Sequence, residues 1–265
     1  MVESDAYDIS NNILADVSNF AVGLVVKEGD AGSRVLGSGT LVSIEGRRGI
    51  LTCGHVAAAY ERLTELGLIL FSRKGRHRRV LNLTETQTII VQSSDDWTET
   101  DLDLAFTLLP PDVASSIDAQ AVFLNIDKNR EKIERAEPAE GMHVDVMLGL
   151  VAEYSEKPFV EGTEITSPMR AVLHTGHVSK QENGLLTFDA MGYNLELLPA
   201  SFGGMSGGAL WRVYFTEQNG RADIVLRALC GVAFWQIEES TQLACQGWDR
   251  IDQALIPAVR ENFPL

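Results

Sequence analysis

The stretch GGMSGGAL, residues 203–210, places a single serine, Ser206, among four glycines. Because glycine has no side chain, such a segment can adopt tight backbone conformations and leaves open space around the serine hydroxyl. A glycine-rich turn between two strands would require nothing further. A nucleophilic serine would require a base and an acid from elsewhere in the chain, so the preceding segments decide between the two interpretations.

Two earlier segments supply those side chains. The stretch GSGTLVSIEGRRGILTCGHV, residues 37–56, brings His55 to the end of an apolar run, and TDLDLAF, residues 100–106, alternates Asp101 and Asp103 with leucines. In a strand, side chains two residues apart point to the same face, so both carboxylates would lie on one side. Taken alone, the histidine is typical of a structural position and the aspartates are typical of a solvated strand edge.

Composition limits the classes of function. The chain has 265 residues, three cysteines and a formal net charge of −15, with 45% hydrophobic residues. Three cysteines cannot form a disulfide framework, and a strongly acidic chain is unsuited to phosphate backbones or anionic membranes. No apolar run approaches the roughly 20 residues of a membrane-spanning helix, and the acidic start MVESDAYDISNN is unlike a secretory signal. We therefore expect a cytoplasmic protein that binds neither nucleic acid nor membranes.

Short apolar runs separated by Gly, Asp and Ser predict two sets of antiparallel strands. The first set comprises residues 19–27, 35–44, 49–53, 67–72, 87–93 and 102–109. The second set comprises residues 143–150, 169–179, 184–190, 208–215 and 225–235. Between the sets, residues 127–140 are almost wholly polar and are typical of a linker. The pattern predicts two β lobes, residues 1–126 and 141–265, arranged as two small barrels side by side or as one sandwich with insertions.

Three segments favour helices at the periphery of this all-β fold. Residues 8–17 form a candidate short N-terminal helix. The Ala-rich stretch HVAAAYERLTEL, residues 55–66, predicts a helix of about three turns that starts at His55. Residues 251–262 have the pattern of an amphipathic C-terminal helix, which Pro257 should bend.

Taken in order, GSGTLV, LTCGHV, DLAF and GMSGGAL resemble the motifs of trypsin-like (chymotrypsin-fold) serine peptidases, in particular disulfide-free bacterial members. Further on, CGVAFWQ, residues 230–236, is similar to the strand that lines the substrate cleft in that family, with Trp235 at the position of its usual tryptophan. The resemblance spans nearly the whole chain. It implies two six-stranded antiparallel β-barrels packed side by side, with His55 and Asp103 on the first and Ser206 on the second.

The resemblance also implies a mechanism based on a Ser-His-Asp triad. Ser206 would attack the scissile carbonyl, His55 would take and return the proton, and Asp103 would orient the imidazole. The backbone N–H groups of Gly204 and Ser206 would form the oxyanion hole. Asp103 is preferred to Asp101 because the family's carboxylate precedes a Leu/Ile–Ala pair, as it does here.

The resemblance further implies which residues contact the substrate. Ala200 stands at the base of the primary specificity pocket, where an enzyme that cleaves after Lys or Arg would carry Asp. Ser201 follows without a charge, Phe234 and Trp235 belong to the cleft strand, and Gln236 would narrow the entrance. We therefore expect the chain to cleave protein or peptide substrates after an uncharged small or aliphatic residue.

The leading hypothesis is thus a serine endopeptidase that uses no metal or other cofactor. One alternative is a catalytically silent module that binds a peptide or protein partner through the same cleft or through the basic stretch FSRKGRHRRV, residues 71–80. Another is an esterase or acyl-transfer enzyme with the same triad. A further hypothesis is that residues 200–205 stay disordered until an activating protein partner binds.

Overall fold

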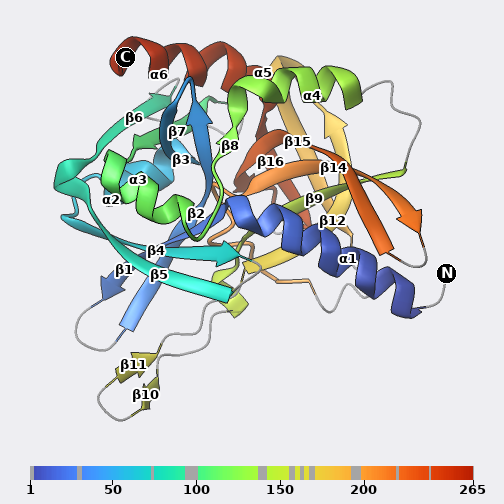
Figure 1. Cartoon of the computed structure of the whole chain (residues 1–265), viewed down its shortest axis with the longest axis horizontal. Helices are drawn as coiled ribbons and strands as arrows, with labels where there is room; N and C mark the ends of the chain where they lie inside the picture. Colours follow the sequence, from blue (N-terminus) through green and yellow to red (C-terminus); the bar gives the residue numbers. More distant parts are fainter. Residues whose placement is uncertain are drawn as a thin grey trace.

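The two halves of the chain form two β lobes that lie side by side, with helices along their outer surfaces (Figure 1). The structure is a computed structural model that describes residues 3–28, 32–72, 75–92, 101–136, 142–154, 159–161, 164–166, 171–191, 198–218, 221–238 and 240–264. Within these residues, every helix is too short or too polar to cross a membrane.

The N-terminal lobe is built on an open sheet of mainly antiparallel strands. Its strands are β1 Ala21–Glu28, β2 Gly32–Ile44, β3 Arg47–Thr52, β4 Glu65–Ser72, β5 Gly75–Asn82, β6 Gln87–Gln92, β7 Asp103–Leu108 and β8 Leu124–Asn125. The hydrogen-bonded order is β5-β4-β1-β2-β3-β7-β6, and β8 pairs with β2 in parallel. Strand β3 pairs with both β2 and β7. Because β3 and β7 are antiparallel, the last residues of β3 lie beside the first residues of β7.

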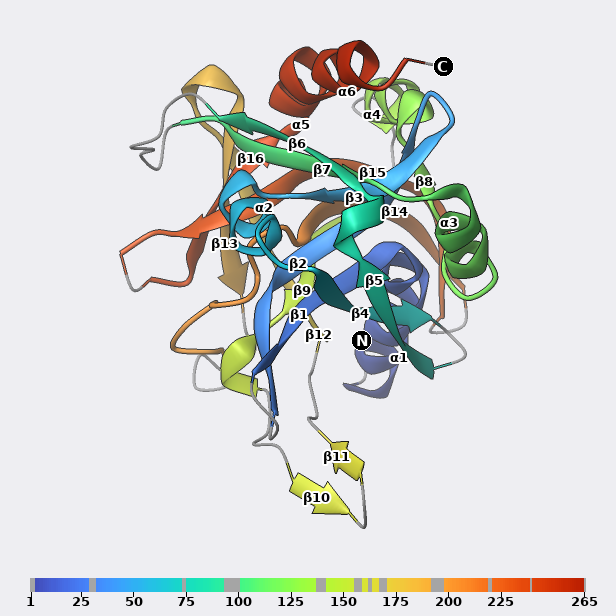
Figure 2. The same ribbon diagram turned by 90° about the vertical axis from the view of Figure 1, so that its left-hand side faces the viewer.

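The C-terminal lobe is a closed barrel of six antiparallel strands. These are β9 Met142–Leu150, β12 Ala171–Lys180, β13 Leu185–Met191, β14 Ala209–Gln218, β15 Arg221–Gln236 and β16 Gln242–Gly247. The barrel closes in the order β12-β13-β16-β15-β14-β9. A hairpin of β10 Phe159–Glu161 and β11 Glu164–Thr166 extends away from the body of the molecule (Figure 2).

The expected pair of six-stranded barrels is therefore confirmed for the C-terminal lobe and corrected for the N-terminal lobe. In the N-terminal lobe the described strands number eight, and the edge strands β5 and β6 do not pair with each other. The extra strand β5 arises because the basic stretch after β4 alternates its side chains and pairs with β4 from Glu65↔Asn82 to Ser72↔Gly75. This pairing buries Leu66, Leu68 and Leu81, which supply the apolar face that a strand needs.

Two helices frame the N-terminal lobe, and a third lies on the barrel. Helix α1 Glu3–Val17 packs on β15, buries Ile13 and Val17, and pairs Asp16 with Arg227 at 2.8 Å. Helix α2 Gly54–Tyr60 is shorter than expected, because the chain returns to extended structure at Glu65. Helix α3 Pro111–Asp118 packs beside β3.

The segment between the lobes and the C-terminus are also helical. Helix α4 Asn129–Ala136 lies within residues 127–140, which were expected to be a linker, and it packs on β15. The C-terminal helix consists of α5 Trp248–Arg250, a π-helical turn Ile251–Leu255 and α6 Ile256–Asn262. Pro257 lies in the first turn of α6 and has no backbone N–H to donate. The wider π-helical turn just before it accommodates this missing hydrogen bond. Single turns of 3-10 helix cover Ser18–Phe20, Leu83–Glu85, Ile126–Lys128, Ala152–Tyr154 and Glu182–Gly184.

The two lobes share a continuous apolar core. Leu24 and Leu41 of the sheet belong to the same buried cluster as Leu148 and Trp211 of the barrel. A second cluster, which includes Met147, Phe188, Phe202, Leu210 and Cys245, packs among the barrel strands. The lobes therefore form one packed body, so residues from both can be held in fixed geometry where they meet.

Candidate active site

His55 and Asp103 contact each other where β3 ends and β7 begins. His55 is the second residue of α2, which follows β3, and Asp103 is the first residue of β7, which pairs with β3. The Nδ1 atom of His55 and Oδ2 of Asp103 are 2.6 Å apart. The backbone N–H of His55 also donates to Asp103 Oδ1 at 2.9 Å. The carboxylate therefore fixes both the ring and the backbone of the histidine.

The carboxylate of Asp103 is buried, and a third donor satisfies it. The Nε2 atom of Gln92, at the end of β6, donates to Asp103 Oδ1 at 3.1 Å. Burial by itself raises the pKa of Asp103, but the hydrogen bonds and charge of His55, together with Gln92, outweigh it and hold the pKa below its ordinary value. Asp103 is thus an ionised acceptor that favours the Nδ1–H tautomer of His55.

Asp101 has a different position from Asp103. Its backbone carbonyl accepts hydrogen bonds from Gln246 Nε2 and from Arg250 Nη1, each at 2.8 Å. Arg250 also donates to Gln246 Oε1 at 2.9 Å, so three groups form one connected set. The barrel lobe therefore fixes the backbone at Asp101, two residues before Asp103. The carboxylate that contacts His55 belongs to Asp103.

Ser206 lies in the turn before β14. It lines a cavity of about 230 Å³ that His55 also lines. Its hydroxyl donates to the carbonyl oxygen of Phe234 at 3.4 Å. The flanking Gly204 and Gly207 have φ angles of +91° and +87°, which side-chain-bearing residues rarely adopt. Gly204 and Gly207 are thus needed for the turn that presents the serine.

The backbone N–H groups around Ser206 are of two kinds. Most of them donate to nearby acceptors. Before the serine, Ser201 donates to Glu153 Oε2 at 2.9 Å, Phe202 to Gln236 Oε1 at 3.0 Å, Gly203 to Ser201 Oγ at 3.2 Å and Met205 to the Phe202 carbonyl at 2.9 Å. After it, Gly207 donates to the Ala233 carbonyl at 2.8 Å and Gly208 to the Met205 carbonyl at 2.7 Å. The N–H groups of Gly204 and Ser206 have no acceptor among the described residues. Both N–H groups, two positions apart, are therefore available as donors, and an oxyanion hole needs two such donors that converge on one point.

The sheet lobe supports this turn through Ser38 of β2. The Ser38 N–H donates to the Ser206 carbonyl at 2.7 Å, and the Ser38 hydroxyl donates to the Gly204 carbonyl at 2.8 Å. The same hydroxyl accepts a hydrogen bond from the Leu150 N–H at 2.7 Å. Ser38 is 2% exposed, so all three bonds are made away from water. This buried serine joins the two lobes directly behind the serine turn.

Among the residues that the structure describes, His55 is the one ionisable side chain in the wall of the cavity beside Ser206. Its remaining lining residues are Ser201, Phe202, Gly203, Met205, Ala233, Phe234, Trp235, Gln236 and Leu243. Of the residues expected to contact substrate, Ser201, Phe234, Trp235 and Gln236 therefore lie at this cavity. Trp235 is 43% exposed, which leaves an apolar surface at the rim.

Ala200 lies outside the lining of this cavity. It is exposed, and its carbonyl accepts a hydrogen bond from Gln236 Nε2 at 3.4 Å. Phe202 and Met205, which are buried and were not expected at the site, form part of the wall instead. His174 of β12 packs edge-on against Phe202, with ring centroids 5.3 Å apart. No local signal marks His174, because its contact with Phe202 joins residues that are distant in the sequence.

Cys53, His55 and Asp103 also have the spacing of a metal site, because each offers a ligand atom within 4.8 Å of the others. Their contacts suit a hydrogen-bonded arrangement better. The Cys53 thiol donates to the Ala233 carbonyl at 3.0 Å, and burial, followed by the nearby charge of Asp103, raises its pKa well above the ordinary value. A thiol that stays protonated is a poor metal ligand.

Comparisons with known proteins gave distant structural similarity. No protein-family model matches the chain, and no curated protein matches it. A solved structure described as GrC has a TM-score of 0.49 and 12% identity, and covers 93% of this chain and 96% of its own. A second, from work on the coupled folding and binding of the intrinsically disordered Sesbania mosaic virus VPg protein, has a TM-score of 0.45 and 16% identity, over 88% of this chain and 87% of that chain.

Proposed function

We propose that this protein is a serine endopeptidase in which Ser206 is the nucleophile and His55 the general base. Asp103 orients the imidazole of His55 and stabilises its protonated form. The observation that carries the proposal is the 2.6 Å contact between Asp103 and His55, together with the cavity that His55 and Ser206 both line. A serine hydroxyl is a weak nucleophile at neutral pH, and an oriented imidazole that removes its proton overcomes this weakness.

The proposed reaction follows from these groups. Ser206 Oγ attacks the carbonyl carbon of the substrate while His55 accepts its proton, and the carbonyl oxygen becomes an oxyanion held by the N–H groups of Gly204 and Ser206. His55 then returns the proton to the leaving amine, which leaves an acyl group on Ser206. Water, deprotonated by His55, releases this group. Each N–H donor in such a site contributes about 3–4 kcal/mol to lowering the barrier.

The lining of the cavity supports an uncharged residue on the acyl side of the cleaved bond. Phe202, Met205 and Leu243 offer apolar surface, and His55 is the one ionisable side chain among the described residues that line the cavity. A Lys, Arg, Asp or Glu side chain would lose its hydration there without gaining a partner. The volume of about 230 Å³ favours a small or aliphatic side chain.

The test is a reaction with a fluorophosphonate probe, followed by the intact mass of the protein. Wild type is expected to gain one adduct, and Ser206→Ala none. Ser201→Ala is the matched control, because Ser201 lines the same cavity and its loss should leave the adduct in place. Absence of an adduct on folded wild type would contradict the proposal and would favour the module that binds a peptide or protein partner through this cleft.

A further inference from the structure

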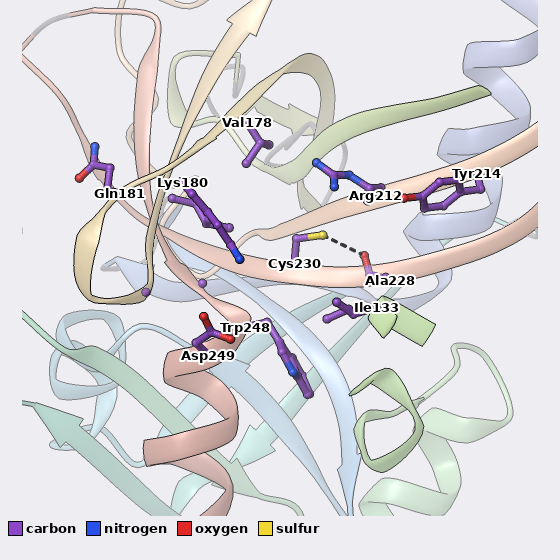
Figure 3. A pocket seen from close by; sticks show the side chains of 13 residues that line it. Ile133, Val178, Lys180, Gln181, Arg212, Tyr214, Ala228, Cys230, Trp248 and Asp249 are labelled. Atoms are coloured by element: carbon purple, nitrogen blue, oxygen red, sulfur yellow. Dashed lines mark hydrogen bonds between the residues drawn. The ribbon is translucent and has the colours of Figure 1, made fainter. Parts of the chain in front are cut away.

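A second cavity, with a volume of about 480 Å³, lies on the barrel lobe and shares no lining residue with the candidate active site. Strands β12, β13, β14 and β15 form one side of it, and Ile133 of α4 and Trp248 of α5 approach from the other (Figure 3). Its volume falls within the range of small-molecule sites in proteins, which is about 300–1,000 Å³. The proposed peptidase reaction makes no use of this cavity.

The cavity, which we call the barrel pocket, has an apolar part. Val178, Leu186 and Cys230 contribute to it from the strands, together with Ile133 and Trp248 from the helices. Leu186 belongs to the buried cluster of the barrel, and Val178 and Cys230 pack against that cluster. This wall is therefore held by the barrel core and is formed before any ligand arrives.

The polar groups of the barrel pocket are mostly hydrogen-bond donors. Lys180 extends its ammonium group toward the middle of the pocket, and the guanidinium of Arg212 and the hydroxyl of Tyr214 lie along another side (Figure 3). Arg212 is fixed by Asp145, with Nε to Oδ1 at 2.7 Å and Nη2 to Oδ2 at 3.0 Å. These bonds leave further N–H groups of the guanidinium available.

Lys180 makes no ion pair within the described part of the chain, although Asp249 lines the same pocket. Among the described lining residues Lys180 and Arg212 are cationic and Asp249 is anionic, in a protein whose formal net charge is −15. Asp145 balances the charge of Arg212, so the ammonium of Lys180 is the cation available to a ligand. A cationic group placed beside an apolar wall attracts a ligand that combines an apolar body with an anionic, acceptor-rich end.

We propose that the barrel pocket binds a small amphipathic carboxylate, with its apolar body against Val178, Leu186 and Trp248 and its carboxylate on the Lys180 ammonium. This binding function is independent of the proposed peptidase activity. It places the apolar part of the ligand on the preformed wall and gives the unpaired ammonium an anionic partner.

The test compares three probes of equal chain length that differ in charge: octanoate, octan-1-ol and octylammonium. Binding to the full chain is measured by isothermal titration calorimetry. Octanoate is expected to bind at one site at least tenfold more tightly than octan-1-ol, and octylammonium is expected to bind most weakly. Equal affinity for octanoate and octan-1-ol, or tighter binding of octylammonium, would overturn the proposal.

Two variants locate the site. Lys180→Gln should weaken octanoate binding at least fivefold and leave octan-1-ol unchanged, whereas Lys27→Gln, a change at an exposed lysine of β1, should alter neither. Val178→Phe should weaken both probes by filling the apolar part. Because Lys180 is exposed, its variant should fold even if Val178→Phe does not. Octanoate binding that is unchanged in Lys180→Gln would show that the ligand lies elsewhere.

Discussion

The hydroxyl of Ser38 donates to the carbonyl oxygen of Gly204 at 2.8 Å, although the two residues are 166 positions apart in the chain. Ser38 lies on the sheet lobe and Gly204 in the turn that presents Ser206 from the barrel lobe. The bond directs the Gly204 carbonyl toward the sheet lobe, behind the turn. The geometry of the proposed oxyanion hole therefore depends on how the two lobes are joined.

Ser38→Ala tests this dependence. The change leaves the buried Gly204 carbonyl and the Leu150 N–H without their partner, so we expect a loss of about 2 kcal/mol in the free energy of unfolding. Labelling of Ser206 by the fluorophosphonate should slow as well, because the turn is less well fixed. Urea unfolding and the rate of adduct formation measure the two effects.

Thr40→Val is the matched control for Ser38→Ala. Thr40 lies two residues further along β2, and its buried hydroxyl has no hydrogen-bond partner among the described residues. Removal of that hydroxyl should change the free energy of unfolding by less than about 0.5 kcal/mol, or stabilise the protein. Equal losses in the two variants would mean that Ser38 acts only by filling space.

Asp103→Asn tests the role of the buried carboxylate. Asparagine cannot hold His55 in the same tautomer with a negative charge, so the rate of adduct formation at Ser206 should fall by about 10³- to 10⁴-fold. Asp101→Asn should change that rate little, because Asp101 meets Gln246 and Arg250 through its backbone carbonyl. A large loss in Asp101→Asn with little loss in Asp103→Asn would reverse the assignment of the two aspartates.

The residues that sequence reasoning could find are those marked by short local patterns. His55, Asp103 and Ser206 each lie in a motif of a few residues, and the structure places His55 and Asp103 in contact and Ser206 at the same cavity. Ser38 and Gln92 could not be assigned a role in this way. Their contacts depend on how β2 and β6 align with segments that are distant in sequence. The residues around Ser38 and Gln92 do not predict this alignment.

The differences in secondary structure have a similar origin. The stretch 55–66 is Ala-rich and favours a long helix, but Leu66, Leu68 and Leu70 become buried when β4 pairs with β1, so the helix ends at Tyr60. The polar segment 127–140 includes Asn129, a buried residue that links α4 to β15. The Asn129 side chain is fully buried and bonds both the carbonyl and the N–H of Leu229, each at 2.9 Å. Tertiary contacts outweigh local propensity in both segments.

His174 should make the protein less stable as the pH falls from about 6.5 to about 4. Burial lowers the pKa of His174 from 6.5 to about 4, so in this range the unfolded chain binds a proton that the folded chain does not. The loss for this group reaches about 3 kcal/mol at the lower end of the range. Asp103 is charged in the folded protein, and its pKa is lowered. Its contribution to the free energy of unfolding is therefore lost only as the pH falls below the ordinary value of 3.8.

The measurement for His174 is the free energy of unfolding by urea at several pH values between 7 and 4. His174→Phe should flatten the dependence on pH, whereas His177→Phe, a change at the exposed histidine on the same strand, should leave it as in wild type. Parallel curves for wild type and His174→Phe would show that His174 does not remain neutral in the folded protein.

The three cysteines should be unreactive in the folded protein. All are free thiols, and burial raises the pKa of Cys53, of Cys245 and of Cys230, the last to about 12. At pH 8 the thiolate of Cys230 is then about one part in 10⁴, which makes disulfide exchange slow. Reaction with a disulfide reagent should release close to no product from native protein and three equivalents after denaturation. Rapid reaction of one native equivalent would contradict the raised pKa values.

Gly207→Ala should prevent stable folding, whereas Gly46→Ala should be tolerated. Both glycines have positive φ angles, +87° and +82°, so alanine costs about 1–2 kcal/mol of backbone strain at either position. At Gly46 a new Cβ meets nothing within 4 Å, but at Gly207 it would lie 1.9 Å from the Ser38 carbonyl oxygen and 2.2 Å from Thr52 Oγ1. Because these atoms belong to the junction between the lobes, relief of the clash would push the two lobes apart.

Urea unfolding should show a loss of about 1 kcal/mol in the free energy of unfolding for Gly46→Ala and of more than about 3 kcal/mol for Gly207→Ala. Equal stability of the two variants would mean that the lobes can move apart behind Ser206 at little cost.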